Sequence, residues 1–160
     1  MAEAPESILR TWRYEHGTSA ACIRAVPQGT AAFRPHGRSR SMGELCRHLG
    51  EAERFFVVGC LGVEVPGPDP VAKDAPLPDP GAVADAFDRS HAALAAAVEA
   101  RAPAWFEEPV EFYGMRLPRA DVLGVMVRHE VHHRGQLSVY LRLAGGKVPA
   151  IYGPSADAGA

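Results

Sequence analysis

The sequence has few of the features that indicate a disulfide framework, a membrane span or an exported protein. Three cysteines occur in 160 residues, Cys22, Cys46 and Cys60, and they form no CxxC pair, so neither a disulfide scaffold nor a thiolate zinc site is indicated. The longest apolar run, Phe55 to Val63, is much shorter than the roughly 20 residues of a membrane-spanning helix. The first residues, MAEAPESILR, lack the pattern of a secretory signal. We therefore expect a protein of the reducing cytoplasm with no membrane partner.

A strong charge of either sign is also missing. Lys and Arg number 17 against 19 Asp and Glu, which gives a net charge of -2, so no global field attracts DNA or RNA. The hydrophobic fraction of 47% and the charged fraction of 22% are those of an ordinary globular protein. We expect a single domain over residues 1–160 and a small-molecule substrate rather than a nucleic acid.

Four segments carry apolar residues at helical spacing and predict four helices. Ser41 and Glu44 have the spacing of a capping box at the start of the second helix, and Gly145 ends the last one. The predicted helices span about 6–26, 41–61, 80–100 and 119–144.

The segments between these helices complete the predicted architecture. The stretch from Pro66 to Pro80 holds six of the 14 prolines and predicts a surface crossover between helices two and three. Trp105 to Arg116 is expected to be extended or hairpin-like, with a turn at Gly114. The fold class is therefore all-α, a four-helix bundle with one crossover and a short extended segment before the fourth helix.

Histidines occupy positions where aliphatic residues are expected. At 100° per residue, His129 and His133 fall near the centre of the apolar stripe of the last helix, with Arg134 on the opposite side. His48 lies beside Leu45 on the second helix and also points inward or nearly so. Buried imidazoles need partners, and a divalent ion bound by all three would provide them while keeping coordination positions open. His48, His129 and His133 are the candidate metal ligands.

Other interpretations of these histidines stay open. Each could be a hydrogen-bonded core residue, and His16, His91 or Glu44 could add a fourth ligand that closes the site. His129 to His133 also satisfies HExxH, in which Glu130 would act as general base. After His133 the chain has no histidine or glutamate and only Asp157 among acidic residues, so the third ligand of a zincin is missing. We interpret that match as a coincidence and keep Glu130 as a candidate base.

Three stretches of the sequence resemble the DinB-like family of metal-binding four-helix bundles. They are His48 within GELCRHLGEAERF, the run HEVHHRGQL from His129, and the ending YLRLAGGKVPAIYGPSAD. The resemblance implies a bundle, usually a homodimer, in which His48, His129 and His133 hold nickel, zinc or a similar ion. Relatives include bacillithiol transferases and mycothiol-dependent isomerases, and the family label does not imply DNA binding. Only the metal motif matches here, and the thiol-binding residues of those relatives do not.

Three functions are compatible with such a site. The first is a metal-dependent enzyme, a thiol S-transferase or a hydrolase, that activates a low-molecular-weight thiol or water. The second is a non-catalytic stress-response protein that binds metal or a small ligand, and the third is a metal-stapled homodimer. Val127 and Val131, expected on the outer face of the last helix, and Trp105 and Tyr113 support a dimer. Zinc, nickel, iron and copper suit three imidazoles equally.

Overall fold

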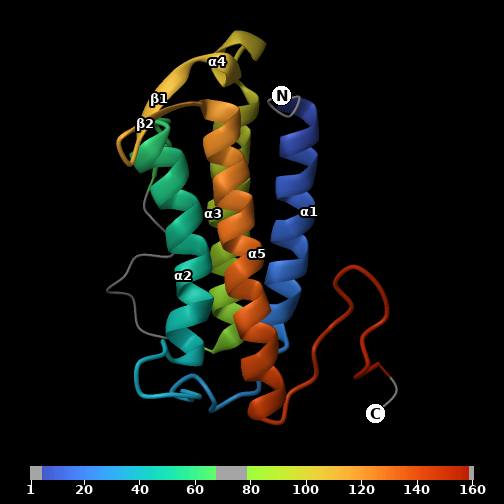
Figure 1. The fold of residues 1–160 in the computed structure, drawn as a ribbon. Helices are drawn as coiled ribbons and strands as arrows, with labels where there is room; N and C mark the ends of the chain where they lie inside the picture. Colours follow the sequence, from blue (N-terminus) through green and yellow to red (C-terminus); the bar gives the residue numbers. More distant parts are fainter. Residues whose placement is uncertain (1–4, 68–78, 159–160) are drawn as a thin grey trace.

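The computed structural model describes residues 5–67 and 79–158, and its long helices lie side by side in one bundle (Figure 1). Helices α1 and α2 each pack against both α3 and α5, which confirms the all-α four-helix bundle expected from the sequence. The elements are α1 Pro5–Arg24, α2 Met42–Arg54, η1 Phe55–Cys60, α3 Pro80–Glu99, α4 Pro103–Glu107, β1 Pro109–Phe112, β2 Met115–Pro118 and α5 Arg119–Leu143. No helix within the two described ranges is long and apolar enough to cross a membrane.

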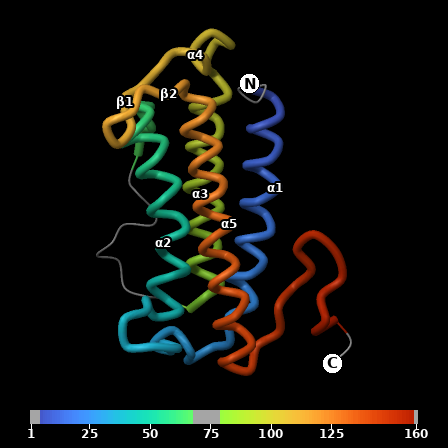
Figure 2. Tube along the Cα trace, viewed as in Figure 1, coloured from blue at the N-terminus to red at the C-terminus, as the bar shows by residue number. Residues whose placement is uncertain are grey.

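The connection between η1 and α3 has the crossover topology that the sequence predicts. Element η1 ends near one end of the bundle and α3 begins near the other, as a crossover connection requires (Figure 2). Residues 68–78, which make up most of the proline-rich stretch, lie outside the described residues. The predicted helix boundaries agree with the structure to within two residues for α1, α3 and α5.

The second predicted helix is made of two different kinds of helix. Helix α2 begins with the expected capping box: Glu44 donates its N–H to Ser41 Oγ over 3.2 Å, and Ser41 donates its N–H to Glu44 Oε2 over 2.8 Å. From Phe55 the backbone widens into the π-helix η1, where Leu61 N–H donates to Phe56 O over 2.9 Å. Single π-turns often occur at functional sites, and this one brings Phe55 and Phe56 beside the histidines described below.

The segment before α5 is a short helix followed by a hairpin, where the sequence predicts an extended or hairpin-like piece. Trp105 lies in α4, while β1 and β2 pair antiparallel with Phe112 opposite Met115. Tyr113 and Gly114 form the turn with φ of 48° and 79°, because a two-residue hairpin turn of this type needs left-handed backbone at both positions. The expected turn at Gly114 is confirmed.

The interior is divided into two apolar cores by a layer of buried polar side chains. One core holds Trp12, Leu94 and Met126, and the other holds Ile23, Phe87 and Leu137. On each long helix at least one buried residue between these two cores is polar. We call this group the polar layer: Glu15, His16 and Ser19 of α1, Glu53 of α2, Ser90 and His91 of α3, and Glu130, His133 and Arg134 of α5.

The buried face of α5 differs from the one that the helical wheel predicts. Arg134, expected on the outside, is 2% exposed and forms an ion pair with Glu15 Oε2 at 2.6 Å. Val127, expected on the outer face, is buried in the first apolar core, whereas Leu143, expected inside, is exposed. The centre of the buried face lies nearer Glu130 than His129, because Glu130 and the paired Arg134 occupy positions where aliphatic residues are expected. Val127 therefore gives no support to a dimer.

The capping box generates the first prediction. Ser41→Ala removes the acceptor for the Glu44 amide, so the free energy of unfolding should fall by about 1 kcal/mol. Urea denaturation measures this change. Ser138→Ala is a matched control, because the Ser138 hydroxyl donates only to the carbonyl of Gly135 one turn earlier in α5, and its effect should stay within about 0.5 kcal/mol. Equal losses in the two variants would contradict a capping role for Ser41.

Candidate metal centre

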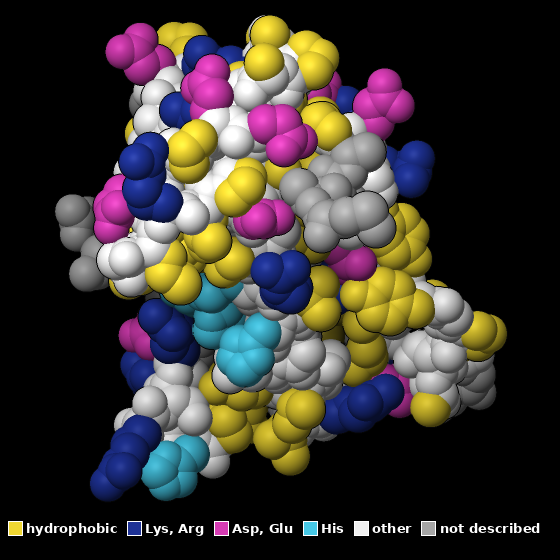
Figure 3. Space-filling view, turned by 45° about the horizontal axis from the view of Figure 1, so that its top comes forward, with side chains coloured by type: hydrophobic (Ala, Val, Ile, Leu, Met, Phe, Trp, Pro, Cys, Tyr) yellow, Lys and Arg dark blue, Asp and Glu magenta, His cyan; other side chains and the backbone are white. Residues whose placement is uncertain are grey.

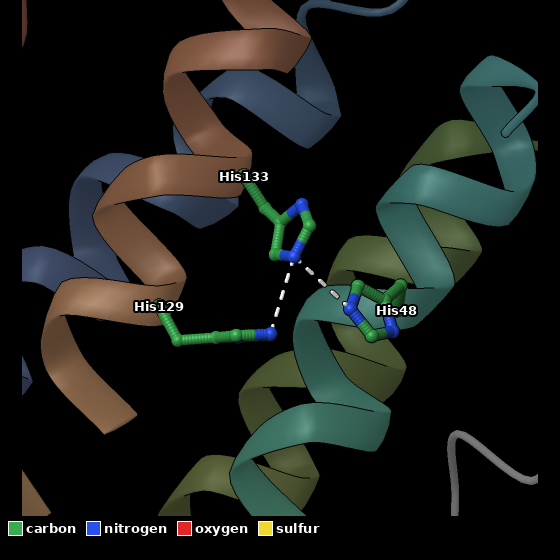
Figure 4. Close-up of side chains that lie close together, drawn as sticks. All are labelled: His48, His129 and His133. Atoms are coloured by element: carbon green, nitrogen blue, oxygen red, sulfur yellow. Dashed lines mark hydrogen bonds between the residues drawn. The ribbon is translucent and has the colours of Figure 1, made fainter. Parts of the chain in front are cut away.

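His48, His129 and His133 direct their Nε2 atoms toward one point between α2 and α5 (Figure 4). The Nε2 atom of His133 lies 3.2 Å from that of His48 and 3.1 Å from that of His129. The two residues of α5 are one turn apart, so their side chains project from the same face, and α2 supplies the third ring from the facing helix. The structure thus brings together the three residues that the sequence singled out as metal ligands.

The donor set fits a divalent transition metal. Ligand nitrogens at about 2.0–2.1 Å around a tetrahedral ion lie roughly 3.3–3.4 Å apart, close to the separations observed here. His133 Nδ1 lies 2.8 Å from Gln136 Oε1, and since an amide oxygen can only accept, Nδ1 carries the hydrogen and Nε2 presents its lone pair to the site. Gln136 is therefore a positioning residue that the sequence analysis did not single out, although its i+3 spacing from His133 could have indicated it.

All three imidazoles are held in the neutral form that binds metal. Burial lowers the pKa of His48 to about 4, with further contributions from the positive charge of Arg40 and from the other two rings. Burial, followed by His133, His132 and Arg40, lowers the pKa of His129 to about 4 as well. The pKa of His133 is also lowered, chiefly by burial, although its hydrogen bond to Gln136 acts in the opposite direction. Protons therefore compete weakly with a metal ion for these nitrogens near neutral pH.

A cavity of about 550 Å³ opens directly beside the triad. Its walls are mainly aromatic and aliphatic, and the one carboxylate among them is that of Glu51. Figure 3 shows histidine side chains on one face of the molecule, with hydrophobic and basic side chains next to them. The lining residues are His48, Glu51, Ala52, Phe55, Phe56, Phe112, Tyr113, Val125 and His129.

Glu130 lies in the polar layer and does not line this cavity. Its side chain is 2% exposed, and burial together with the negative charge of Glu53 raises its pKa well above the usual range. This shift favours the protonated, uncharged form of the carboxyl group. The zincin arrangement, in which the glutamate of HExxH faces a metal-bound water, is not formed around His129 and His133.

The other candidate ligands lie apart from the triad. Glu44 caps α2 and forms an ion pair with Arg34 at 2.8 Å. His16 and His91 belong instead to a second group with Glu53, whose ligand atoms all lie within 4.8 Å of one another and could hold a metal ion. Glu53 cannot be identified as a candidate ligand from the sequence, because a single glutamate on an otherwise apolar face carries no spacing signal.

The fold and the triad define a four-helix-bundle protein with a three-histidine cluster at the edge of the bundle. The sequence model of the DinB family matches residues 1–160, and the chain belongs to that family.

Known proteins agree with this assignment. The chain is 25% identical over 166 residues to the protein described as "Uncharacterized protein YrdA" of Bacillus subtilis (strain 168), covering 98% of this chain and 93% of that protein. A DinB-like protein from Bacillus cereus ATCC 10987 superposes with a TM-score of 0.82 at 21% identity, covering 95% of this chain and all of the other. For the DinB-like protein YjoA of Bacillus subtilis the TM-score is 0.67 at 19% identity, covering 87% of this chain and 92% of the other.

The lowered pKa values generate a prediction for the metal-free protein. The unfolded chain takes up protons on these histidines near pH 6.5, whereas in the folded chain His48 and His129 stay neutral down to about pH 4. Stability should therefore fall as the pH drops from about 6.5 to about 4. Urea denaturation of the chelator-treated protein at pH 7 and pH 5 measures this fall.

A comparison of variants tests whether the three histidines cause this loss of stability at low pH. A His129→Ala, His133→Ala double variant should lose less stability between pH 7 and pH 5 than the unmodified chain. The control, His36→Ala, removes an exposed loop histidine and should keep the full pH dependence. If the double variant and the control respond identically, the triad is not the source of the pH dependence.

Proposed function

We propose that this protein binds a divalent metal ion, zinc, nickel or iron, through His48, His129 and His133 and activates a low-molecular-weight thiol for transfer to a small electrophilic substrate. The observation that carries the proposal is the convergence of three Nε2 atoms beside an open aromatic cavity, whose wall includes His48 and His129. The bacillithiol and mycothiol enzymes that the sequence motifs resemble support the choice of a thiol. Such thiols are abundant in the reducing cytoplasm, where we place the reaction.

The charge of the ligand set favours an anionic co-substrate. Three neutral imidazoles leave a bound divalent ion with its full charge, so the ion would lower the pKa of a coordinating thiol and supply a thiolate nucleophile. Arg40 adds positive charge close enough to lower the pKa of all three histidines. A second hollow of about 380 Å³ is lined by Arg40, Glu44, Arg47 and Glu51. We assign this hollow to a carboxylate of the thiol, which bacillithiol and glutathione carry.

The aromatic cavity is suited to the electrophile. Phe55, Phe56 and Phe112 form apolar walls next to His129, and Tyr113 is 78% exposed at the rim. A small apolar or aromatic substrate would lose contact with water there and lie against the metal-binding face of the triad. Glu51 lines both hollows, so the two hollows adjoin and the two substrates would lie next to each other.

Thiol activation is favoured over hydrolysis by the position of Glu130. Hydrolysis requires a base that accepts a proton from water, and Glu130 is buried with a raised pKa and does not line the cavity. A thiolate is itself the nucleophile and needs no such base. Non-catalytic binding of metal or a small ligand is the alternative function, and it predicts no turnover with any thiol.

The proposed binding of a thiol to a metal ion at the triad generates the third prediction. Cobalt-substituted protein should develop a thiolate-to-cobalt charge-transfer band with bacillithiol, mycothiol or glutathione. His129→Ala and His133→Ala should each abolish that band and remove the stabilisation by metal at this site. Absorbance titration and the melting temperature with and without cobalt measure the two effects.

A Glu130→Gln variant distinguishes the two mechanisms. It should retain most of the thiol-transfer activity, since the carboxyl group takes no part in the proposed reaction. If no thiol perturbs the cobalt spectrum while Glu130→Gln eliminates a hydrolytic activity, the protein activates water and the proposal is wrong.

We also propose that the protein forms a homodimer, as the family resemblance implies. Val131 and Trp105 are half-buried, which leaves Tyr113 as the strongest support among the residues named from the sequence. Phe55 and Met115, each 51% exposed, extend the apolar surface near the hairpin. Exposed aromatic side chains of this kind often lie in protein interfaces.

Light scattering at micromolar concentration tests the dimer. The measured mass should be twice the chain mass of 17.1 kDa. A Tyr113→Asn, Met115→Ser variant should shift the equilibrium toward the monomer, and asparagine tolerates the left-handed backbone of position 113. A monomeric mass for the unmodified chain would contradict the proposal.

A further inference from the structure

The second histidine group lies at the centre of the bundle, in the polar layer. His16 comes from α1, Glu53 from α2 and His91 from α3, and they share no residue with the triad. Their exposed fractions are 7%, 1% and 8%. Glu53 Oε1 lies 3.0 Å from His91 Nδ1 and 3.7 Å from His16 Nδ1. Three helices therefore bring an imidazole, a carboxylate and a second imidazole to one buried point.

Neighbouring hydrogen bonds fix which atom of His16 faces this point. His16 Nε2 lies 2.8 Å from Asp88 Oδ1, and Arg24 holds the other oxygen of Asp88 at 2.6 Å. Because a carboxylate that pairs with arginine is ionised and only accepts, Nε2 carries the hydrogen. In the neutral ring Nδ1 then presents a lone pair toward Glu53. A carboxylate behind a histidine is a common arrangement around protein metal ligands.

The polar layer also contains buried atoms that lack hydrogen-bond partners. Within the described parts of the chain these are His16 Nδ1, Glu53 Oε2, Ser90 Oγ and both carboxyl oxygens of Glu130. The raised pKa of Glu130 favours its uncharged form, in which one of its oxygens can donate a hydrogen bond. The two unpartnered atoms beside the His16–Glu53–His91 group, His16 Nδ1 and Glu53 Oε2, are acceptors, so this part of the layer has more lone pairs than hydrogens. Buried acceptors without partners are costly. A cation is the kind of ligand that an excess of buried acceptors requires.

We infer that His16, Glu53 and His91 form a second divalent-cation site, closed to solvent and separate from the triad. Two imidazoles and one carboxylate favour zinc, iron or manganese among biological divalent ions. The His16 and His91 rings are stacked, 3.7 Å apart and 10° from parallel. His91 Nδ1 donates to Glu53 Oε1 when that carboxylate is ionised, so binding of an ion requires a modest tilt of one ring and a shift of the His91 hydrogen from Nδ1 to Nε2.

The surroundings point to a structural role for this ion. Glu53 Oε1 also accepts a hydrogen bond of 2.6 Å from Trp12 Nε1, and the His91 ring packs edge-on against Trp12. Phe87 covers His16 with a ring separation of 4.2 Å. Aromatic side chains thus enclose the site, and a substrate has no evident route to an ion there. An ion held by α1, α2 and α3 would link three of the four long helices.

The experiment counts metal ions in the tag-free, full-length chain. A buried site loads as the chain folds, so each variant is refolded from urea with zinc, passed through a desalting column and analysed for metal. The unmodified chain should hold two zinc ions, and the His129→Ala, His133→Ala variant, which lacks the triad, should hold one. Glu53→Gln combined with that double variant should hold none, while Glu99→Gln, a surface control on α3, should leave one ion in place.

The zinc counts test the buried site and the triad independently, so failure of one site can be told from failure of the other. If the triad-deficient variant holds no zinc although its circular dichroism shows a folded bundle, the buried site does not bind metal and the inference is overturned. One ion in both the unmodified chain and the triad-deficient variant would support the buried site and contradict the triad as a zinc site. If Glu53→Gln fails to fold, His91→Gln in the triad-deficient background replaces it, and retention of the ion there would also overturn the inference.

Discussion

The buried side chains of the polar layer need hydrogen-bond or ion-pair partners, and this requirement constrains how the helices of the bundle pack. Each long helix places at least one charged or ionisable side chain between the two apolar cores, and Arg134 and Glu15 form an ion pair within that layer at 2.6 Å. An unpaired charge at this depth would cost several kcal/mol, so the partners fix how α1 and α5 are rotated about their axes. The tail contributes as well, since the Tyr152 hydroxyl donates to Glu15 and accepts from Arg134.

The position of the triad follows from this rotation. With Glu130 and Arg134 facing the interior, His129 and His133 are displaced toward α2, where His48 meets them. The triad thus lies at the edge of the bundle, where the imidazoles are desolvated enough to stay neutral and still border an open cavity. A triad at the centre of the bundle would have been shielded from any substrate. The π-helix η1 then adds Phe55 and Phe56 to the cavity wall.

Much of this architecture can be predicted from local sequence signals. The capping box at Ser41, the hairpin turn at Gly114 and the i, i+4 pair of His129 and His133 each depend on residues close together in the chain. The burial of Arg134 and the grouping of Glu53 with His16 and His91 depend on partners in other helices. A helical wheel takes hydrophobicity as the measure of burial, and therefore places a paired arginine on the wrong side of α5. The π-helix likewise has no local signal in a segment as apolar as FFVVGC.

The central claim is that α2 and α5 orient three Nε2 atoms around one metal ion that keeps open coordination positions. An anomalous difference map of crystals grown with zinc, measured on both sides of the zinc absorption edge, tests it most directly. The account predicts a peak about 2.0–2.1 Å from the Nε2 atoms of His48, His129 and His133, with no further protein ligand and with its free side toward the aromatic cavity. Absence of a peak there, or a fourth protein ligand that closes the site, would contradict the account.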